Sequence, residues 1–229
     1  MPRMGGVLSD GRQGPRHTRA VLFDLDGTLL DSFEQYRRGV TAALQDFGFA
    51  VPSRVEIQKT MGLPGAEVVV RLGVPAAEAH AVHGRWVEHS LHLGHLSRPF
   101  PGVASLLNGL RARGHLLGIV TSRSRRGVVG TSCAAELASY MDVIVTRDDT
   151  EMGKPRPDPI VHALRALQTD PQEAVYVGDA SYDIDAGKRA GCVAVLATWD
   201  ETRMRAPGDF LPDHVVASVD ELRDLLLRE

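Results

Sequence analysis

Short apolar runs alternate with amphipathic segments along most of the chain, and this alternation predicts a layered α/β fold. Runs of four to six mainly apolar residues that end in polar residues are typical of strands buried in a parallel sheet. We expect such strands at 20–23, 116–120, 141–146, 174–177 and 193–196. An apolar pair at 215–216 and a helix at 219–227 are expected to close the edge of the sheet.

The segment after the first strand has a helical period instead. Phe33, Val40 and Leu44 recur at helical spacing, and Asp31 or Ser32 is a suitable N-cap. Glycine and proline then separate further helical patterns, so that we expect helices at 33–47, 54–61, 66–72 and 76–93. After these helices the alternation of strand and helix resumes.

These elements predict a doubly wound parallel α/β core with an inserted helical cap. We expect the core at 19–31 and 100–229 and the cap at 32–99. Residues 1–18 are rich in Gly, Arg, Pro and Ser and show no periodicity, so we expect a flexible leader.

Polar clusters follow four of the expected strands. Asp24 and Asp26, two residues apart in an extended segment, are expected to project to the same side, and Gly27 allows the chain to turn. The other clusters are Thr121-Ser122, the loop around Lys154, and Asp179 with Asp183. Because ligands of such sheets bind at the carboxyl ends of the strands, we expect these clusters to form one site.

Lys154 lies in an unusually rigid setting, Gly153-Lys154-Pro155-Arg156-Pro157-Asp158-Pro159. Prolines restrict the backbone and therefore hold the lysine in place, whereas a surface lysine normally lies in a flexible polar stretch. The segment is not a phosphate-binding P-loop, because proline follows the lysine and the upstream glycine is missing.

Four motifs resemble the haloacid dehalogenase superfamily, in its phosphoglycolate phosphatase and β-phosphoglucomutase-like branch. They are D-x-D-G-T-[LV]-x-D-S at 24–32, the apolar strand closed by Thr or Ser at 121–122, G-K-P-x-P-D-P at 153–159 and G-D-x-x-x-D at 178–183. The resemblance covers nearly the whole chain apart from the leader, and in that branch a helical cap covers the active site.

The resemblance implies a phosphatase that uses Mg²⁺. Asp24 would be the nucleophile that forms an aspartyl-phosphate, and Asp26 would protonate the leaving oxygen and then deprotonate water. The metal would be held by the side chains of Asp24 and Asp179 and the backbone carbonyl of Asp26, with Asp183 orienting the site. The phosphoryl group would be bound by Lys154, Thr121 and Ser122.

We expect a small phosphorylated metabolite as substrate, because a closing cap leaves little room for a large one. Phosphoglycolate is the first candidate, since Arg123 follows the second motif and could pair with a substrate carboxylate, although it could also be solvated. A β-phosphoglucomutase-like phosphomutase and an inorganic pyrophosphatase remain open on the same core. A dehalogenase or a phospho-accepting signalling receiver would leave Asp26 without a role.

Composition sets wider limits. The formal charge of −3 does not favour binding to nucleic acid or to a membrane, and two distant cysteines suggest neither a disulfide framework nor a zinc site. We expect a cytoplasmic monomer or homodimer. Histidines at 80, 83, 89, 92 and 95 could chelate a transition metal, but solvation or packing is the favoured interpretation.

Overall fold

The structure is a computed structural model that describes residues 18–201 and 208–227. Its strands are β1 (Ala20–Phe23), β2 (Leu30–Asp31), β3 (Arg98–Pro99), β4 (Leu116–Val120), β5 (Val143–Val145), β6 (Ala174–Gly178), β7 (Val193–Ala197) and β8 (His214–Val216). Its helices are α1 (Phe33–Asp46), α2 (Arg54–Gln58), α3 (Gly65–Arg71), α4 (Ala79–His92), α5 (Val103–Ala112), α6 (Arg125–Val129), α7 (Ser132–Ala138), α8 (Asp158–Ala166), α9 (Ser181–Ala190) and α10 (Val219–Leu227). Short 3-10 helices are η1 (Gly94–Leu96), η2 (Arg147–Asp149) and η3 (Pro171–Glu173). The expected leader, 1–18, lies outside the described residues except for Thr18.

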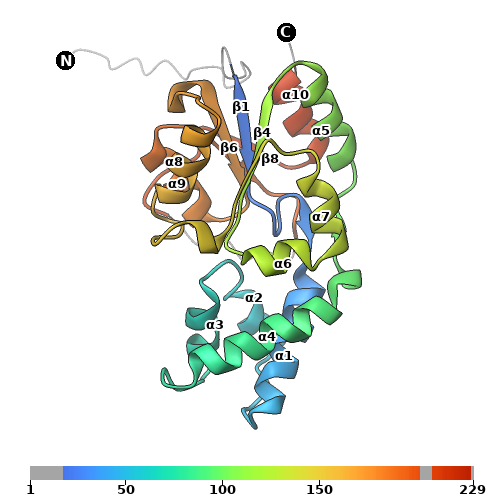
Figure 1. Cartoon of the computed structure of the whole chain (residues 1–229), viewed down its shortest axis with the longest axis vertical. Helices are drawn as coiled ribbons and strands as arrows, with labels where there is room; N and C mark the ends of the chain where they lie inside the picture. The colour runs from blue at the N-terminus through green and yellow to red at the C-terminus, as the bar shows by residue number, and fades with distance from the viewer. Residues whose placement is uncertain (1–17, 202–207, 228–229) are drawn as a thin grey trace, which may run out of the picture.

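Within the described residues, six strands form one parallel sheet in the order β5-β4-β1-β6-β7-β8 (Figure 1). β1 lies between β4 and β6, with Phe23 paired to Ile119 on one side and to Val177 on the other. The prediction of a parallel α/β fold with an inserted helical region is confirmed. β8 pairs with β7 at the edge of the sheet, as the sequence predicts.

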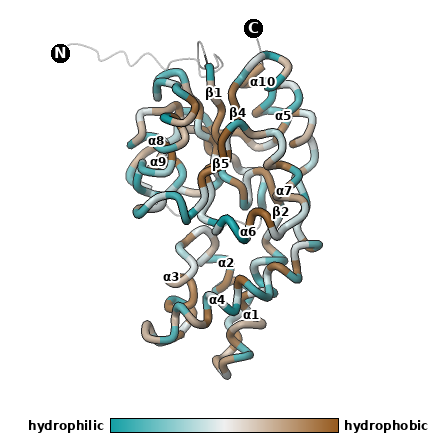
Figure 2. The backbone as a smooth tube through the Cα atoms, viewed as in Figure 1, coloured by the Kyte–Doolittle hydropathy of each residue, from teal (hydrophilic) through white to brown (hydrophobic). Residues whose placement is uncertain are grey.

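The alternation of side chains along β1 divides the interior into two layers. Val21 and Phe23 pack in a cluster with α5, α7 and α10, whereas Ala20 and Leu22 pack in a second cluster with α8 and α9. These four side chains are completely buried. Figure 1 shows the two groups of helices on opposite faces of the sheet, and Figure 2 shows the hydrophobic colour concentrated on the central strands.

The helical region between β2 and β3 has a hydrophobic cluster of its own, formed by residues of α1 to α4. Gly39 of α1 allows α4 to approach closely, because a Cβ there would lie 2.5 Å from Ser90 Oγ and 2.9 Å from Trp86 Cδ1. Tyr36 and Trp86 then meet edge to face at 5.0 Å. The separate cluster agrees with a cap, and the division at 32–99 stays a prediction.

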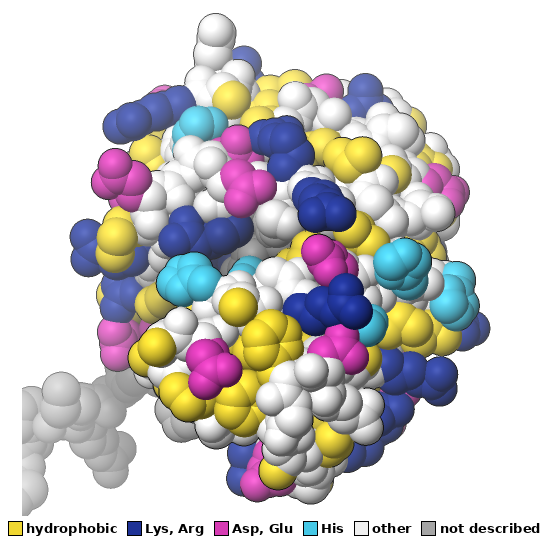
Figure 3. Space-filling model, turned by 60° about the horizontal axis from the view of Figure 1, so that its bottom comes forward, with side chains coloured by type: hydrophobic (Ala, Val, Ile, Leu, Met, Phe, Trp, Pro, Cys, Tyr) yellow, Lys and Arg dark blue, Asp and Glu magenta, His cyan; other side chains and the backbone are white. Residues whose placement is uncertain are grey.

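The two connections to the helical region lie side by side. β2 and β3 pair antiparallel, Leu30 with Pro99 and Asp31 with Arg98. The sequence did not predict this two-residue ladder. Figure 3 shows charged side chains of both signs on the helical region. In this region Arg85 contacts Asp46 at 2.5 Å. Among the described helices, none is long and apolar enough to cross a bilayer.

Two short helices, α6 and α7, were also not predicted. Gly127 and Gly130 interrupt the helical spacing there, and each helix is only five or seven residues long. α2 and α4 differ from the prediction at their ends: α2 ends at Gln58 and α4 begins at Ala79, because the residues after Pro75 form a turn first. Neither difference moves the strand ends that carry the polar clusters.

Gly118 provides a test of the packing around the central strands. A Cβ on Gly118 would lie 2.6 Å from Leu22 Cδ2 and 2.7 Å from Val143 Cγ1. We expect Gly118→Ala to destabilise the protein by about 1–3 kcal/mol through overpacking, measured as a lower urea midpoint. The control is Gly84→Ala in α4, where a Cβ meets no atom within 4 Å and helix propensity predicts about 0.5–1 kcal/mol of stabilisation. Equal shifts in the two variants would contradict the packing of this strand.

Candidate active site

The loop after β1 fixes the two leading aspartates. The backbone N–H of Asp24 donates to Val177 O at 2.8 Å, so that the strand pairing continues to this residue. Gly27 then turns the chain with φ of 88°, and the N–H groups of Leu29 and Leu30 close the loop on Leu25 O. Asp24 and Asp26 both line one cavity at this edge of the sheet.

Lys154 reaches the same place from its proline-rich loop. Its Nζ donates to Asp24 Oδ1 and to Asp183 Oδ1, each at 2.7 Å. Two neutral oxygens complete the environment, Tyr176 Oη at 3.0 Å and Val120 O at 3.2 Å. The lysine side chain is only 2% exposed, so that these ion pairs are poorly screened by solvent.

Burial and charge act in opposite directions on this group of residues. Burial raises the pKa of Asp24 to about 6, although the charge of Lys154 lowers it, and the charge of Asp183 raises it further. Burial alone would lower the pKa of Lys154, but the charges of Asp183 and Asp24 outweigh burial and raise it. The ammonium therefore stays charged near neutral pH, while the Asp24 carboxylate carries an electrostatic cost.

Three buried carboxylates, those of Asp24, Asp179 and Asp183, have oxygens within 4.8 Å of one another. At that distance a pair of unit charges repels by about 3 kcal/mol with an effective dielectric near 20. Three carboxylates and the Lys154 ammonium leave two negative charges if all are ionised, which a divalent cation would balance. Oxygen donors of this kind suit Mg²⁺, so that the residues present fit the expected metal.

Hydrogen bonds from neighbouring groups orient two of these three carboxylates, those of Asp179 and Asp183. Thr28 Oγ1 donates to Asp179 Oδ1 at 3.2 Å, and Thr28 O accepts a hydrogen bond from the indole of Trp199 at 3.1 Å. Asp183 Oδ2 accepts from the N–H of Ala180 at 3.1 Å, and its Oδ1 already contacts Lys154. These bonds support an orienting role for Asp183, which stays a prediction, as does coordination by the Asp26 carbonyl.

The residues predicted to bind phosphate lie on the same cavity. Thr121, Ser122 and Lys154 line it together with the aspartates. Thr121 Oγ1 accepts a hydrogen bond from the N–H of Arg123 at 3.1 Å, which shapes the turn after β4. The structure therefore brings together the residues that the four motifs contribute, and their individual roles remain predictions.

Arg123 lies in an environment that the sequence did not indicate. Its Nε donates to Asp26 Oδ2 at 2.7 Å and its Nη2 to Asp26 Oδ1 at 2.5 Å, a two-pronged ion pair. The Arg123 side chain is 17% exposed. Burial lowers the pKa of Arg123, but the charge of Asp26 outweighs this and raises it. Arg123 is thus neither solvated nor free to pair with a substrate carboxylate without competing against Asp26.

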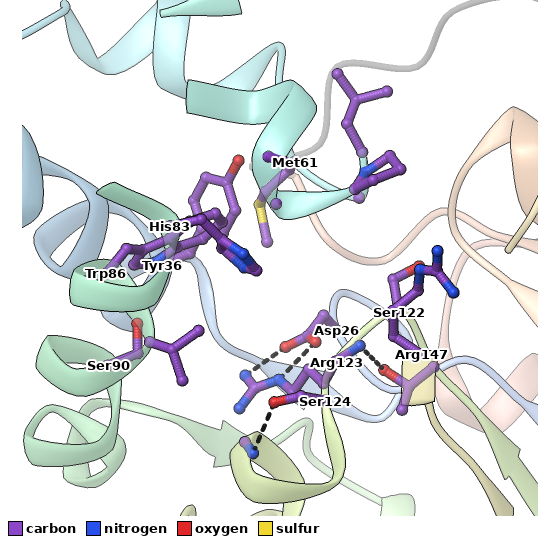
Figure 4. A pocket seen from close by; sticks show the side chains of 18 of the residues that line it. Asp26, Tyr36, Met61, His83, Trp86, Ser90, Ser122, Arg123, Ser124 and Arg147 are labelled. Carbon is purple, nitrogen blue, oxygen red and sulfur yellow. Dashed lines mark hydrogen bonds and ion pairs between the residues drawn. The ribbon is translucent and has the colours of Figure 1, made fainter. Parts of the chain in front are cut away.

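The helical region forms the opposite wall of the cavity, whose volume is about 350 Å³. Figure 4 shows Tyr36, Met61, His83 and Trp86 on that side, facing Asp26 and Arg123. The His83 ring contacts the Trp86 ring at 5.4 Å. Burial lowers the pKa of His83, so that the imidazole is neutral near pH 7.

The other histidines of the helical region have different surroundings. His89 Nε2 contacts Asp46 Oδ2 at 2.8 Å, and His92 Nδ1 contacts Glu88 O at 3.0 Å. His80 lines the cavity beside His83, and His95 is exposed. The role of these histidines therefore stays a prediction.

Sequence reasoning missed several residues of the site. Tyr176, two residues before the end of β6, contacts Lys154 and is completely buried; a tyrosine within an otherwise aliphatic strand was the available signal. Gln35 is 2% exposed and contacts Arg123 at 3.0 Å. Ser32 occupies the N-cap position of α1 but makes no side-chain cap, because its hydroxyl donates to Asp26 Oδ1 at 2.5 Å.

The parallel sheet and the aspartate–lysine cluster at its carboxyl edge define a phosphoryl-transfer type of hydrolase site. A family model described as haloacid dehalogenase-like hydrolase matches residues 21–197, and the chain belongs to this family. The expected family is therefore confirmed.

Relatives and solved structures agree with this assignment. The chain is 32% identical to a pyrophosphatase, PpaX, of Halalkalibacterium halodurans, with 90% of this chain and 95% of that protein covered. It is 29% identical to a phosphoglycolate phosphatase of Escherichia coli O157:H7, with 89% and 90% covered. The crystal structure of a protein from Lactobacillus plantarum superposes on this chain with a TM-score of 0.80 at 26% identity. The match covers 91% of this chain and 99% of that one.

The raised pKa of Asp24 gives a prediction for the metal-free protein. The folded state holds its proton up to about pH 6, whereas the unfolded chain releases it near pH 3.9. Stability from this group is therefore present at low pH and lost as the pH rises through 4–6. We expect Asp24→Asn to gain about 2–3 kcal/mol of stability relative to the natural sequence between pH 4 and pH 7.5 in chelator, because Asn has no carboxyl proton to release.

The measurement is urea denaturation of both proteins at the two pH values, because comparing them cancels the titration of all other groups. Excess Mg²⁺ should stabilise the natural sequence more than the variant, since Asn offers no anionic ligand. A stability difference that does not change with pH would contradict the electrostatic cost assigned to Asp24.

Proposed function

We propose that this protein is a Mg²⁺-dependent phosphatase that hydrolyses a small phosphomonoester, similar in size to phosphoglycolate, through an aspartyl-phosphate. The observation that carries the proposal is the buried contact between Asp24 and Lys154 at 2.7 Å, directly on the cavity that Thr121 also lines. A carboxylate nucleophile and a fixed cation are the two groups that attack on a phosphate dianion requires.

In the first step Asp24 Oδ attacks phosphorus, and the bond from phosphorus to the ester oxygen breaks. Asp26 enters this step in its protonated form and gives the proton to that oxygen, which leaves as an alcohol; the resulting carboxylate is the one that Arg123 binds with two prongs. Lys154 and the hydroxyls of Thr121 and Ser122 stabilise the charge on the phosphoryl oxygens. Bound Mg²⁺ would be held by Asp24 and Asp179 and would supply further charge neutralisation.

In the second step water attacks the phosphorus of the aspartyl-phosphate. Asp26, now ionised, takes a proton from the water, and the bond between phosphorus and Asp24 Oδ breaks with its electron pair returning to the carboxylate. Inorganic phosphate leaves and the enzyme is restored. Asp26 therefore acts in both steps, which makes its position important.

The cavity wall favours a phosphomonoester over pyrophosphate. Among the described residues that line the cavity, the cations Arg123, Arg147 and Lys154 all come from the sheet side. The helical region contributes mainly apolar and aromatic groups such as Tyr36 and Trp86. An uncharged leaving group gains contacts there, whereas a second phosphate gains little.

Pyrophosphatase activity is the second candidate, because PpaX proteins are among the relatives. Phosphoglycolate is retained as a candidate because a phosphoglycolate phosphatase is similar over 89% of this chain. Its carboxylate would have to compete with Asp26 for Arg123, so that the role of Arg123 in substrate binding is the point to test.

The proposal is tested by kcat/KM for phosphoglycolate, an alkyl phosphate, p-nitrophenyl phosphate, a hexose phosphate and pyrophosphate with Mg²⁺. We expect a small monoester to exceed pyrophosphate at least tenfold, and Asp24→Asn to retain less than about 1% of the activity, since the nucleophile is lost. Phosphate release by a fully folded Asp24→Asn would reject this nucleophile. If Arg123→Ala lowers kcat/KM equally for all of these substrates, Arg123 does not select a substrate carboxylate.

Contact between the helical region and the sheet is tested at Gly62. This residue has φ of +90°, and a Cβ on it would lie 1.5 Å from Tyr182 Oη. We expect Gly62→Ala to push the loop away from Tyr182, open the cavity and lower kcat/KM by about tenfold, because water then enters the site.

Gly73→Ala is the matched control for this substitution. Gly73 has φ of +98° in the same helical region, but a Cβ there meets no atom within 4 Å. Both variants bear a similar backbone cost of about 1 kcal/mol. A loss of activity that is the same in both would mean that backbone strain, and not the contact with Tyr182, causes it.

A further inference from the structure

Asp26 is held by more donors than a solvent-facing carboxylate needs. Arg123 binds both of its oxygens, at 2.7 Å and 2.5 Å, and Ser32 Oγ donates to Oδ1 at 2.5 Å. The Asp26 side chain is 24% exposed. These contacts fix the direction of its carboxylate relative to Asp24 and to the cavity.

Arg123 is itself held by residues outside the four motifs. Its Nη2 donates to Gln35 Oε1 at 3.0 Å, and its Nη1 donates to Thr131 Oγ1 at 3.2 Å. Thr131 is completely buried, and Gln35 is 2% exposed. A guanidinium with its donors shared in this way has little freedom to turn, so that the orientation of Arg123 depends on these two partners.

The Gln35 amide is satisfied at both ends. Oε1 also accepts from Ser97 Oγ at 2.6 Å, while Nε2 donates to Ser90 O at 2.7 Å and to Thr131 Oγ1 at 3.3 Å. Arginine only donates and a backbone carbonyl only accepts, so that the amide can face in one direction only. A buried polar network that is fully satisfied is rigid.

The network joins parts of the chain that are far apart in sequence. Gln35 lies in the first turns of α1, Ser90 near the end of α4, Ser97 between η1 and β3, and Thr131 between α6 and α7. Gln35 therefore connects the helical region to Arg123, which lies on the sheet side of the cavity (Figure 4).

We propose that Gln35 is a positioning residue that acts through Arg123 to hold Asp26 in the geometry required for proton transfer. The proposal rests on the proposed phosphatase function. Proton transfer requires heavy atoms within about 2.6–3.2 Å, and supporting residues must hold a site to about 0.5 Å. Loss of Gln35 leaves phosphate binding and the nucleophile in place and lets Asp26 turn with Arg123.

Substrates with different leaving groups distinguish a loss of proton transfer from general damage to the site. p-Nitrophenolate leaves as an anion and needs no proton, so that formation of the aspartyl-phosphate does not require Asp26, whereas its hydrolysis does. In Gln35→Ala we expect a first-turnover burst of nitrophenol within about twofold of the natural sequence, followed by steady turnover about tenfold slower. The phosphoenzyme trapped by acid quenching should therefore accumulate in Gln35→Ala during steady turnover, because its hydrolysis is the slowed step. With an alkyl phosphate, whose leaving oxygen must be protonated, the burst should also slow about tenfold.

Two controls accompany this experiment. Gln45→Ala makes the same change on the exposed face of α1 and should leave burst and steady turnover unchanged. Thr131→Val, which keeps the side-chain volume, removes the other partner of Arg123 and should reproduce the Gln35→Ala pattern more weakly. Thr131→Val therefore decides the question if Gln35→Ala does not fold.

A double variant tests whether Gln35 acts through Arg123. Arg123→Lys keeps the charge but cannot bind Asp26 with two prongs, and adding Gln35→Ala to it should cause no more than about a twofold further loss. Independent, multiplicative losses would overturn the proposal, as would equal slowing of burst and steady turnover with both leaving groups. If the natural sequence forms no phosphoenzyme with any substrate, the proposed function itself fails, which is a different result.

Discussion

The contact of Lys154 with Asp24 and Asp183 is the interaction on which the rest of the site depends. Without the ammonium, three carboxylates within 4.8 Å would lie together in a buried position. Breaking a buried ion pair by removing one partner is strongly destabilising, because it leaves an uncompensated charge. Lys154 therefore connects three segments of the chain: its own proline-rich loop, the end of β1 and the start of α9.

The basic side chains Lys154 and Arg123 balance different carboxylates of the site. Lys154 balances part of the acidic cluster, and Arg123 balances Asp26 at 2.5 Å. If Asp24, Asp179 and Asp183 are all ionised, Lys154 leaves two negative charges in that cluster, which a divalent cation would offset. The wall from the helical region carries aromatic and apolar groups, whereas the cations that line the cavity among the described residues come from the sheet side.

The fold and the aspartate–lysine cluster followed from local sequence features. Asp24, Thr121 and Asp179 each come directly after a buried strand, and the ends of parallel strands meet at one edge. Gln35 could not be found in this way, because its partner Arg123 is 88 residues away and only the packing of α1 brings them together. Helices α6 and α7 were missed because glycine interrupts short patterns whose stability comes from tertiary contacts.

The two tryptophans of the chain lie on opposite sides of the site, which has a spectroscopic consequence. Trp86 lines the cavity on the helical side, whereas the indole of Trp199 donates to Thr28 O, in the loop that orients Asp179. Intrinsic fluorescence therefore contains one reporter for the substrate wall and another for the acidic cluster. Replacing either tryptophan with phenylalanine would separate the two signals, so that occupancy of each half of the site could be followed without an attached dye.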